Sequence, residues 1–276
     1  MRAPGISGVV PAIIVAATSL VSAQWPAYRT SGVPRLLNGQ VNMNAPTPRT
    51  ADGKPDLSGT WENLTGILGA RGAKPELVSL DQVAQASFFD VGQNFKGGLP
   101  LQPWAAALKK QRMDANSKDN PDVWCLPMGN MQFNIHPFPR KMIQTPNVLI
   151  ILYETHMGVR QIFLDGRPKP DNDPQPWWYG YSRGWWEGDT LVVETTNFRD
   201  GEWLDIYGSP LSEAGRTIER FRRLNVGQLE IEVTVDDPKA YTRPFTVKLN
   251  QQLMPDAELI EMVCLENNKS IEHLAK

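Results

Sequence analysis

Residues 229–235 read LEIEVTV, and apolar side chains alternate with polar ones along the whole stretch. Successive side chains of a β-strand point to opposite faces, so this pattern predicts a strand with one buried and one solvated face. The segment FTVKL at 245–249 repeats the alternation. Half-buried strands of this kind, joined by short turns, are typical of antiparallel sheets.

The same pattern extends over most of the chain. We expect strands at 57–62, 147–154, 159–164, 190–195, 216–224, 229–235, 243–252 and 258–266. Turn signals such as Gly188-Asp189 and Asn225-Val226-Gly227 separate them. The expected fold is all-β, an antiparallel meander that closes into a lipocalin-like β-barrel, because closure leaves no exposed strand edge.

Long helices are not expected in a chain that has 22 Gly and 23 Pro among its 276 residues. Residues 103–113 are the clearest exception. Pro103 suits the first helical position, strong helix formers follow it, and basic residues lie late, where the helix dipole favours them. We therefore expect one or two short helices beside the strands.

The charge balance argues against general binding to nucleic acid. The chain has 28 Lys and Arg against 30 Asp and Glu, a net charge of −2. A protein that tracks a phosphate backbone needs a strongly positive field, which this composition does not supply. We expect a small-molecule ligand or substrate as the partner, and the composition leaves the oligomeric state open.

Residues 1–23 have the features of a signal peptide, with Arg2, an apolar run at 8–21 and a small-residue cleavage pattern at 21–23. An uncleaved anchor is the alternative, because Pro11 interrupts the run. Residues 24–56 form an extended Pro-rich lead segment, and 57–276 a single barrel-like domain. After cleavage no second apolar stretch reaches the length of a membrane span, so the sequence predicts a periplasmic or secreted protein.

The chain has two cysteines, Cys125 and Cys264. In an oxidising compartment an even pair far apart in sequence indicates one disulfide, and two separate buried thiols are the alternative. Neither cysteine has the spacing of a zinc motif, and the chain contains no nucleophile elbow, phosphate-binding loop or dinucleotide fingerprint. We expect no metal and no cofactor.

A set of longer motifs is spread over the chain. They are PRTADGKPDLSGTW at 48–61, CLP at 125–127, RQIFLDGR at 160–167, WEGDTLVVE at 186–194 and ERFRR at 219–223. Together they resemble the motifs of a large family of exported bacterial proteins of uncharacterised function. The resemblance spans nearly all of the mature chain and implies one shared architecture, but it implies no activity.

One segment departs from that family's pattern. Relatives commonly read GHPHSE where this chain reads GSPLSE at 208–213. If those histidines carry chemistry or a metal in the relatives, this chain has lost or altered that role. The pair Gly59-x-Trp61 in the first expected strand also resembles the first-strand motif of lipocalins.

Aromatic residues are the most informative feature of the composition, with 9 Trp in the chain and a dense group at 177–186. Such a group can line the mouth of a barrel and stack on an apolar or aromatic ligand, and a packed aromatic plug is the alternative. The candidate ligand-binding residues are Trp61, Trp178, Tyr181, Trp186, Trp203 and Tyr207, with Arg160 and Arg220 as partners for a ligand carboxylate.

Acid–base chemistry has three candidates. Asp205 follows Trp203, and aromatic surroundings can raise the pKa of a carboxyl group. Glu213 lies in a loop before a strand, and His136 lies in the rigid loop 134–139. Each has a structural alternative, an ion pair for the acids and a packed loop position for the histidine.

Two function classes follow, and the fold does not decide between them. The first is an exported β-barrel that binds a small apolar or aromatic molecule. The second is a cofactor-independent lyase, isomerase or hydrolase acting on a small aromatic or cyclic substrate. A structural envelope protein is a third, weaker reading.

Overall fold

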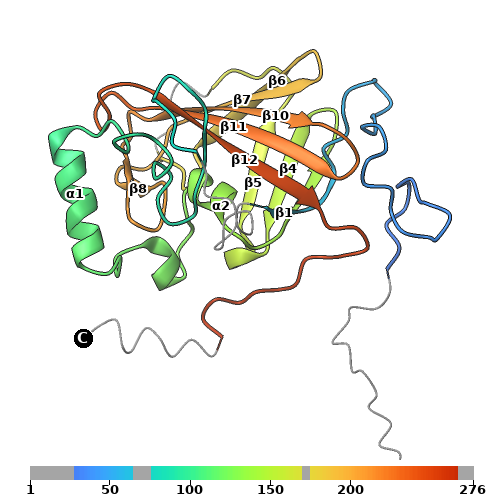
Figure 1. Cartoon of the computed structure of the whole chain (residues 1–276), viewed down its shortest axis with the longest axis horizontal. Coiled ribbons are helices and arrows are strands. Elements are labelled where there is room, and N and C mark those ends of the chain that lie inside the picture. Colours follow the sequence, from blue (N-terminus) through green and yellow to red (C-terminus); the bar gives the residue numbers. More distant parts are fainter. Residues whose placement is uncertain (1–27, 65–75, 170–174, 267–276) are drawn as a thin grey trace, which may run out of the picture.

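The computed structural model describes residues 28–64, 76–169 and 175–266 (Figure 1). The expected signal peptide at 1–23 lies outside the described residues. Over the described ranges the chain is mostly β-structure with two short α-helices, and nine strands close into a barrel. The predicted all-β fold class is confirmed.

The barrel wall is a continuous ring in which each strand pairs with two neighbours. The strands in ring order are β1 (Gly59–Asn63), β3 (Arg140–Gln144), β4 (Val148–Tyr153), β5 (Val159–Phe163), β6 (Tyr181–Glu187), β7 (Thr190–Thr196), β10 (Arg216–Arg223), β11 (Gln228–Asp236) and β12 (Phe245–Leu253). Pairing of β12 with β1, which places Leu253 opposite Trp61, closes the ring.

Three short strands lie outside the ring. The strand β2 (Ala84–Gln85) pairs in parallel with β12. The strands β8 (Glu202–Trp203) and β9 (Pro210–Leu211) form a separate two-stranded ladder. Figure 1 shows β8 to one side of the barrel, next to the helix α1 (Pro103–Asp114).

One contact in the ring departs from the expected meander, because β5 and β6 run parallel. Their register is short, with Ile162 opposite Ser182 and Phe163 opposite Arg183. The other neighbouring pairs of the ring are antiparallel, among them β10 and β11, whose register runs from Arg216 to Arg223. The parallel pair therefore has the shortest ladder of paired residues in the barrel wall.

Alternation along the strands builds the core, as the sequence predicts. In β12 every second residue from Phe245 to Leu253 is buried. In β11 the apolar residues Leu229, Ile231, Val233 and Val235 are at most 1 % exposed. Because the polar residues between them face outward, one strand supplies both the dry interior and the wet surface.

The short helix α2 (Asn130–Ile135) occupies the inside of the ring, and all of its residues are buried. Its amides bind inward-facing side chains of β10: Asn130 donates to Thr217 Oγ1 at 3.4 Å, and Asn134 donates to Glu219 Oε1 at 2.8 Å. The barrel centre is thus filled by this helix and by core side chains.

The two ends of the barrel differ in their connections. Tight turns at 145–147, 188–189 and 224–227 join strands at one end. The other end holds the described part of the long connection between β1 and β3, residues 76–139 with α1 and α2, and the connection 197–215 with β8 and β9. We call this second end the loop end, because the longer connections between antiparallel neighbours gather there.

The structure confirms some local predictions and overturns others. The helix predicted at 103–113 is α1, which begins at Pro103. The strand predicted at 258–266 is wrong, because residues 258–263 have no regular secondary structure and 264–266 form a turn. That tail crosses the barrel surface, where Ile260 N donates to Glu154 Oε2 at 3.2 Å. Its apolar residues Ile260, Val263 and Leu265 are 43–64 % exposed, so their spacing does not mark a strand with a buried face.

The described part of the lead segment, 28–56, packs on the barrel through ion pairs. Arg49 binds Asp189 in the β6–β7 turn at 2.6 Å, and Arg35 binds Asp256 in the tail at 2.6 Å. Figure 1 shows this segment beside the barrel.

Candidate functional site

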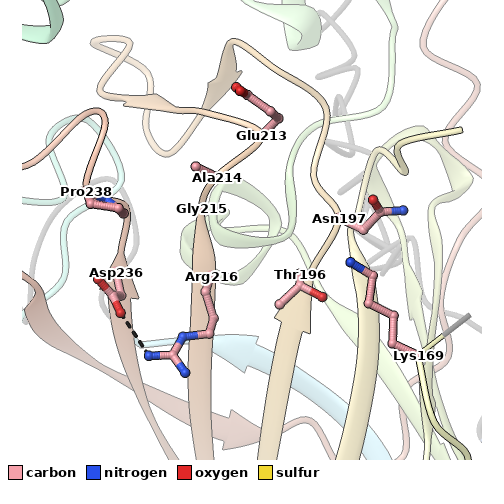
Figure 2. Close-up of a pocket in the computed structure, with 9 residues that line it drawn as sticks. All are labelled: Lys169, Thr196, Asn197, Glu213, Ala214, Gly215, Arg216, Asp236 and Pro238. Atoms are coloured by element: carbon pink, nitrogen blue, oxygen red, sulfur yellow. Dashed lines mark hydrogen bonds and ion pairs between the residues drawn. The ribbon is translucent and has the colours of Figure 1, made fainter. Parts of the chain in front are cut away.

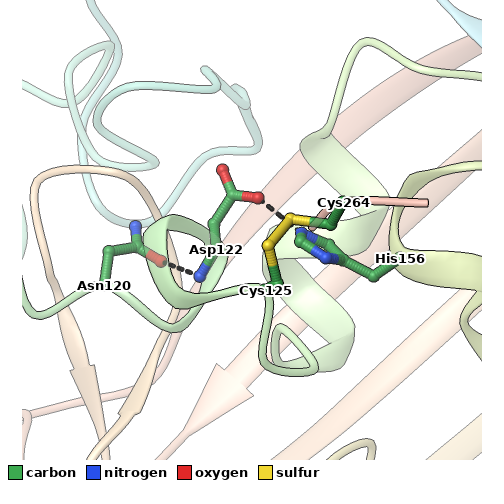
Figure 3. Close-up of a disulfide and its surroundings, with 5 residues drawn as sticks. All are labelled: Asn120, Asp122, Cys125, His156 and Cys264. Atoms are coloured by element: carbon green, nitrogen blue, oxygen red, sulfur yellow. Dashed lines mark hydrogen bonds and ion pairs between the residues drawn. A yellow bond between two sulfur atoms is a disulfide. The ribbon is translucent and has the colours of Figure 1, made fainter. Parts of the chain in front are cut away.

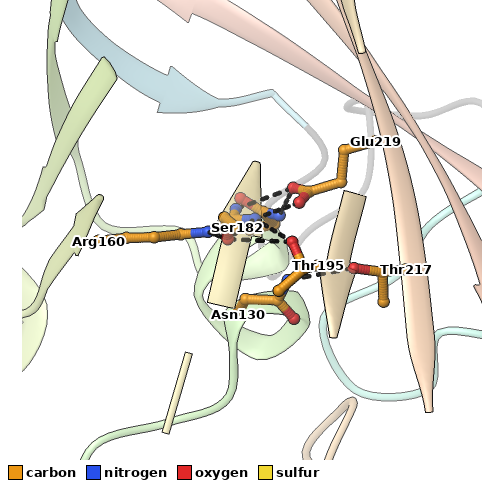
Figure 4. A network of polar contacts seen from close by, with 7 residues as sticks. Asn130, Arg160, Ser182, Thr195, Thr217 and Glu219 are labelled. Atoms are coloured by element: carbon orange, nitrogen blue, oxygen red, sulfur yellow. Dashed lines mark hydrogen bonds and ion pairs between the residues drawn. The ribbon is translucent and has the colours of Figure 1, made fainter. Parts of the chain in front are cut away.

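A buried ion pair lies at the centre of the barrel (Figure 4). Arg160 on β5 donates to both carboxylate oxygens of Glu219 on β10, with Nη1 at 3.0 Å from Oε1. The guanidinium also donates to Ser182 Oγ at 3.1 Å and to Thr195 Oγ1 at 2.9 Å. Both charged side chains are at most 1 % exposed.

This network ties the barrel wall to α2, because Glu219 also accepts from Asn134. The pKa of Arg160 is raised, since attraction to Glu219 outweighs the desolvation that burial causes. A buried charge whose donors and acceptors are satisfied in this way is costly to disturb. Arg160, which lies on β5, thus links that strand to β6 through Ser182, to β7 through Thr195, and to α2 through the shared carboxylate of Glu219.

Glu202 on β8 is a buried acid that makes no ion pair with the residues that the structure describes. It is 5 % exposed, and its Oε2 atom has no hydrogen-bond partner there. Burial raises its pKa to about 8, while the positive charges of Arg199 and Arg112 oppose the shift. A carboxyl group with this pKa exchanges a proton near neutral pH.

Gly129, which precedes α2, makes room for this carboxyl group. A Cβ atom on Gly129 would lie 2.6 Å from Glu202 Oε2, so a larger residue would displace the carboxyl. Burial also raises the pKa of Tyr179, and the negative charge of Glu202 adds to that shift. Tyr179 packs against Phe133 of α2, with ring centroids 5.3 Å apart. The acid and the phenol therefore share the region where α2 enters the barrel.

A polar pocket opens at the loop end, with a volume of about 430 Å³ (Figure 2). Its walls come from the end of β7, the segment before β10, the end of β11 and the segment after β5. The lining residues are Lys169, Thr196, Asn197, Glu213, Ala214, Gly215, Arg216, Asp236 and Pro238. The lining is polar and small-sided rather than aromatic.

Most charges of this pocket are already paired. Arg216 binds Asp236 at 2.8 Å, and Glu213 binds Lys239, which lowers the pKa of Glu213. Lys169 has no ion-pair partner among the residues that the structure describes. Among the described residues, the pocket thus presents the positive charge of Lys169 without a counter-charge.

The structure separates the three acid–base candidates of the sequence. Asp205 is fully buried, accepts from Ser209 N at 3.0 Å and Ser209 Oγ at 2.6 Å, and also accepts from Val91 N at 2.9 Å. These bonds hold two loops together. Glu213 lines the polar pocket, half-exposed and paired with Lys239.

His136 ends α2 and is buried between aromatic rings. Its ring stacks on Phe138 at 5.0 Å and meets Phe88 edge-on at 5.1 Å. Nδ1 accepts from Phe138 N at 3.3 Å. Burial lowers the pKa of His136 to about 4, so the ring is neutral at physiological pH.

The aromatic candidates do not gather around one cavity. Trp61 is fully buried in the core, and Trp203 is buried beneath the guanidinium of Arg112, which lies 4.2 Å from its ring. Tyr207 is 37 % exposed and packs near Phe89.

The group at 177–186 is divided by the alternation of β6. Trp186 packs against the core, whereas Trp185 on the same strand is 43 % exposed. Trp178 stacks with Arg199 at 3.8 Å, and Tyr181 is buried against Phe163. Of the two arginine candidates, Arg160 belongs to the central ion pair, and Arg220 binds Glu187 at the surface at 2.9 Å.

The expected disulfide is present between Cys125 and Cys264, whose Cα atoms lie 5.5 Å apart (Figure 3). It attaches the tail after β12 to the 3₁₀-helix η1 (Pro121–Trp124). His156, in the 3₁₀-helix η2 (Thr155–Met157), lies beside the two sulfur atoms.

Comparisons with protein-family models, with curated proteins and with solved structures found no match for this chain. Among the described residues, no helix has the length and apolar character needed to cross a membrane.

Proposed function

We propose that this chain is an exported protein that binds a small molecule with an anionic group in the polar pocket at the loop end. The observation that carries the proposal is the pocket of about 430 Å³ whose lining includes Lys169, a positive charge with no ion pair to any residue of the described ranges. Pockets for small ligands commonly measure 300–1,000 Å³. The disulfide supports export, because such bonds persist in oxidising compartments.

The chemistry of the lining supports a polar ligand rather than the apolar one expected from the aromatic composition. Thr196 and Asn197 carry groups that can hydrogen-bond to a ligand, and Ala214 and Gly215 allow close approach to the backbone. The charges of Arg216 and Asp236 are paired with each other, so they hold the wall in place. Lys169 is the group best placed to attract a carboxylate.

Calorimetry with benzoate and its uncharged counterpart benzamide tests the proposal. We expect benzoate to bind more tightly, and Lys169→Gln to weaken benzoate binding by about tenfold, the equivalent of about 1.4 kcal/mol. Benzamide binding should change little. Lys96→Gln is the matched control, because Lys96 is exposed and lies outside the pocket lining.

Two results would contradict the proposal. If both compounds bind alike and Lys169→Gln changes neither affinity, the pocket does not select an anion. If indole or naphthalene binds instead and quenches tryptophan fluorescence in both variants, the ligand site is aromatic and the proposal is wrong.

A second function, acid–base catalysis, is favoured by Glu202. Its Oε2 atom is unpartnered in the described structure, and its pKa of about 8 permits proton transfer near neutral pH. Any compound that co-purifies with the protein is the substrate to test. Glu202→Gln should leave binding of that compound intact and reduce its turnover at least 100-fold. Unchanged turnover would remove Glu202 from the reaction, and Glu232→Gln is the matched control on the outer face of β11.

A further inference from the structure

The disulfide forms part of a compact group of metal-ligating atoms (Figure 3). The sulfur atoms of Cys125 and Cys264 and one ring nitrogen of His156 all lie within 4.8 Å of one another. The three residues come from η1, from the C-terminal tail and from η2, so the fold, and not a short sequence motif, brings them together.

The histidine in this group is held in place and has coordinating capacity left. Its side chain is 4 % exposed, and Nε2 lies 2.7 Å from Asp122 Oδ1. Nδ1 is buried and has no hydrogen-bond partner among the described residues. A carboxylate that binds one nitrogen of an imidazole fixes the ring and strengthens the other nitrogen as a ligand, which is the usual arrangement at zinc sites.

The backbone around the group adds a second observation. Cys125 and His156 both have left-handed conformations, with φ of 57° and 55°. Non-glycine residues rarely adopt this conformation, and they persist there where the surrounding structure imposes it. Two of the three residues that carry the ligand atoms are therefore held in this conformation.

We propose that reduction of the Cys125–Cys264 disulfide converts this group into a binding site for Zn²⁺. Two thiolates and one imidazole are ligands that zinc prefers, with Asp122 hydrogen-bonded to the imidazole and a water molecule completing the tetrahedron. The site is separate from the polar pocket and does not depend on the proposed ligand-binding function.

The conversion balances with an external dithiol as the reductant. The dithiol gives up two electrons and two protons to the S–S bond and becomes a disulfide, while Cys125 and Cys264 become thiols. Binding of Zn²⁺ then forms two Zn–S bonds and releases the two thiol protons. Reoxidation needs loss of the metal, so disulfide and zinc exclude each other.

Cobalt provides the direct test, because Co²⁺ occupies zinc sites and absorbs light. The full-length protein is reduced without oxygen by a phosphine, which does not compete for the metal as a dithiol would, and is then titrated with Co²⁺. We expect one equivalent to bind, with thiolate-to-cobalt absorption and the visible bands of a tetrahedral site, and Zn²⁺ to abolish both. The oxidised protein should show neither signal.

Variants then identify the ligands. His156→Gln should weaken Co²⁺ binding by roughly 100-fold, and Asp122→Asn by roughly 10- to 100-fold. Asp119→Asn is the matched control on a nearby exposed acid and should bind like the wild type. X-ray absorption of the zinc-loaded wild type needs no variant and should show two sulfurs at about 2.3 Å and nitrogen at about 2.0–2.1 Å. Equal Co²⁺ binding by reduced and oxidised protein, or a sulfur-free spectrum, would overturn the proposal.

Discussion

Glu202 and His136 are both buried near α2, and burial shifts their pKa values in opposite directions. The pKa of Glu202 rises to about 8, and that of His136 falls to about 4. Both shifts favour the neutral form of the side chain, because a charge is costly in a poorly solvated site. In the unfolded chain Glu202 would be ionised at neutral pH and His136 at mildly acidic pH. The folded protein keeps each group neutral under those conditions.

The free energy of unfolding should fall as the pH rises from about 4.5 to about 8 because of Glu202, and it should level off above that range. Its contribution is complete below the unfolded pKa of 4.5 and is lost as the pH rises through about 8. Each pKa unit corresponds to about 1.4 kcal/mol, so the loss reaches roughly 3–5 kcal/mol by pH 9. Urea unfolding at pH 5, 7 and 9 measures it, and Glu202→Gln should flatten the dependence. If the unfolding free energy of that variant falls equally steeply with pH, groups other than Glu202 cause the effect.

The central ion pair should show strong coupling between its two partners. Glu219→Gln or Arg160→Met alone leaves one buried charge uncompensated and should destabilise the protein by about 3–5 kcal/mol. The double variant removes both charges and should lose less than the sum of the two. A double-mutant cycle from guanidinium unfolding measures the difference, and simple additivity would show that the pair is not coupled.

At the scale of elements, the C-terminal tail is fastened by the disulfide more than by its own contacts. The cysteines are separated by 139 residues, and the loop-entropy estimate for closing such a loop is roughly 5 kcal/mol. Cys125→Ser with Cys264→Ser should lower the unfolding free energy by up to that amount and expose the tail after Leu253 to proteases. Guanidinium unfolding and limited proteolysis measure the two effects. An unchanged proteolysis pattern would show that the ion pair of Glu258 with Lys141 and the hydrogen bond from Ile260 to Glu154 suffice.

The sequence predicts those helices and strands whose formation depends on residues close together in the chain. Alternation predicts β11 and β12, and Pro103 with its following helix formers predicts α1. The helix α2 escapes prediction because burial on every side removes the apolar–polar periodicity that marks a surface helix. The strand β6 escapes because Gly184 and the flanking tryptophans hide its alternation.

The candidate site is less predictable than the fold. The sequence directs attention to the segment around Trp203 and names Asp205 as the candidate acid, but it does not single out Glu202. Hydrogen-bond partners distinguish the two, since Asp205 accepts three bonds and Glu202 Oε2 accepts none within the described chain. The hydrogen-bond partners of a buried acid come from loops that are distant in sequence, so no local sequence pattern predicts them. The polar pocket escapes for the same reason, because its lining comes from four separate segments.

At the scale of the whole molecule, the barrel should open first at β5 and β6. Their ladder is the shortest in the ring, whereas β10 and β11 pair along their full length. Local opening follows the weakest contacts, so amide hydrogens of 181–183 should exchange faster than those of 229–235. Hydrogen exchange followed by mass spectrometry measures this. Equal protection of the two regions would mean that Arg160, bonded to Ser182, secures the narrow contact.

The parallel pairing of β5 with β6 follows from parity. Antiparallel neighbours reverse direction at each step, and a closed circuit of nine members cannot reverse nine times and return to its starting direction. A ring of nine strands must therefore contain an odd number of parallel pairs. In this ring the number is one, the pair of β5 and β6. Loss or gain of a single strand would make the count even and remove the need for a parallel pair. Because β6 runs parallel to β5, the chain must return to the loop end before β6 begins. Residues 164–169, the described start of that return, bring Lys169 to the polar pocket, which follows from the odd number of strands in the barrel.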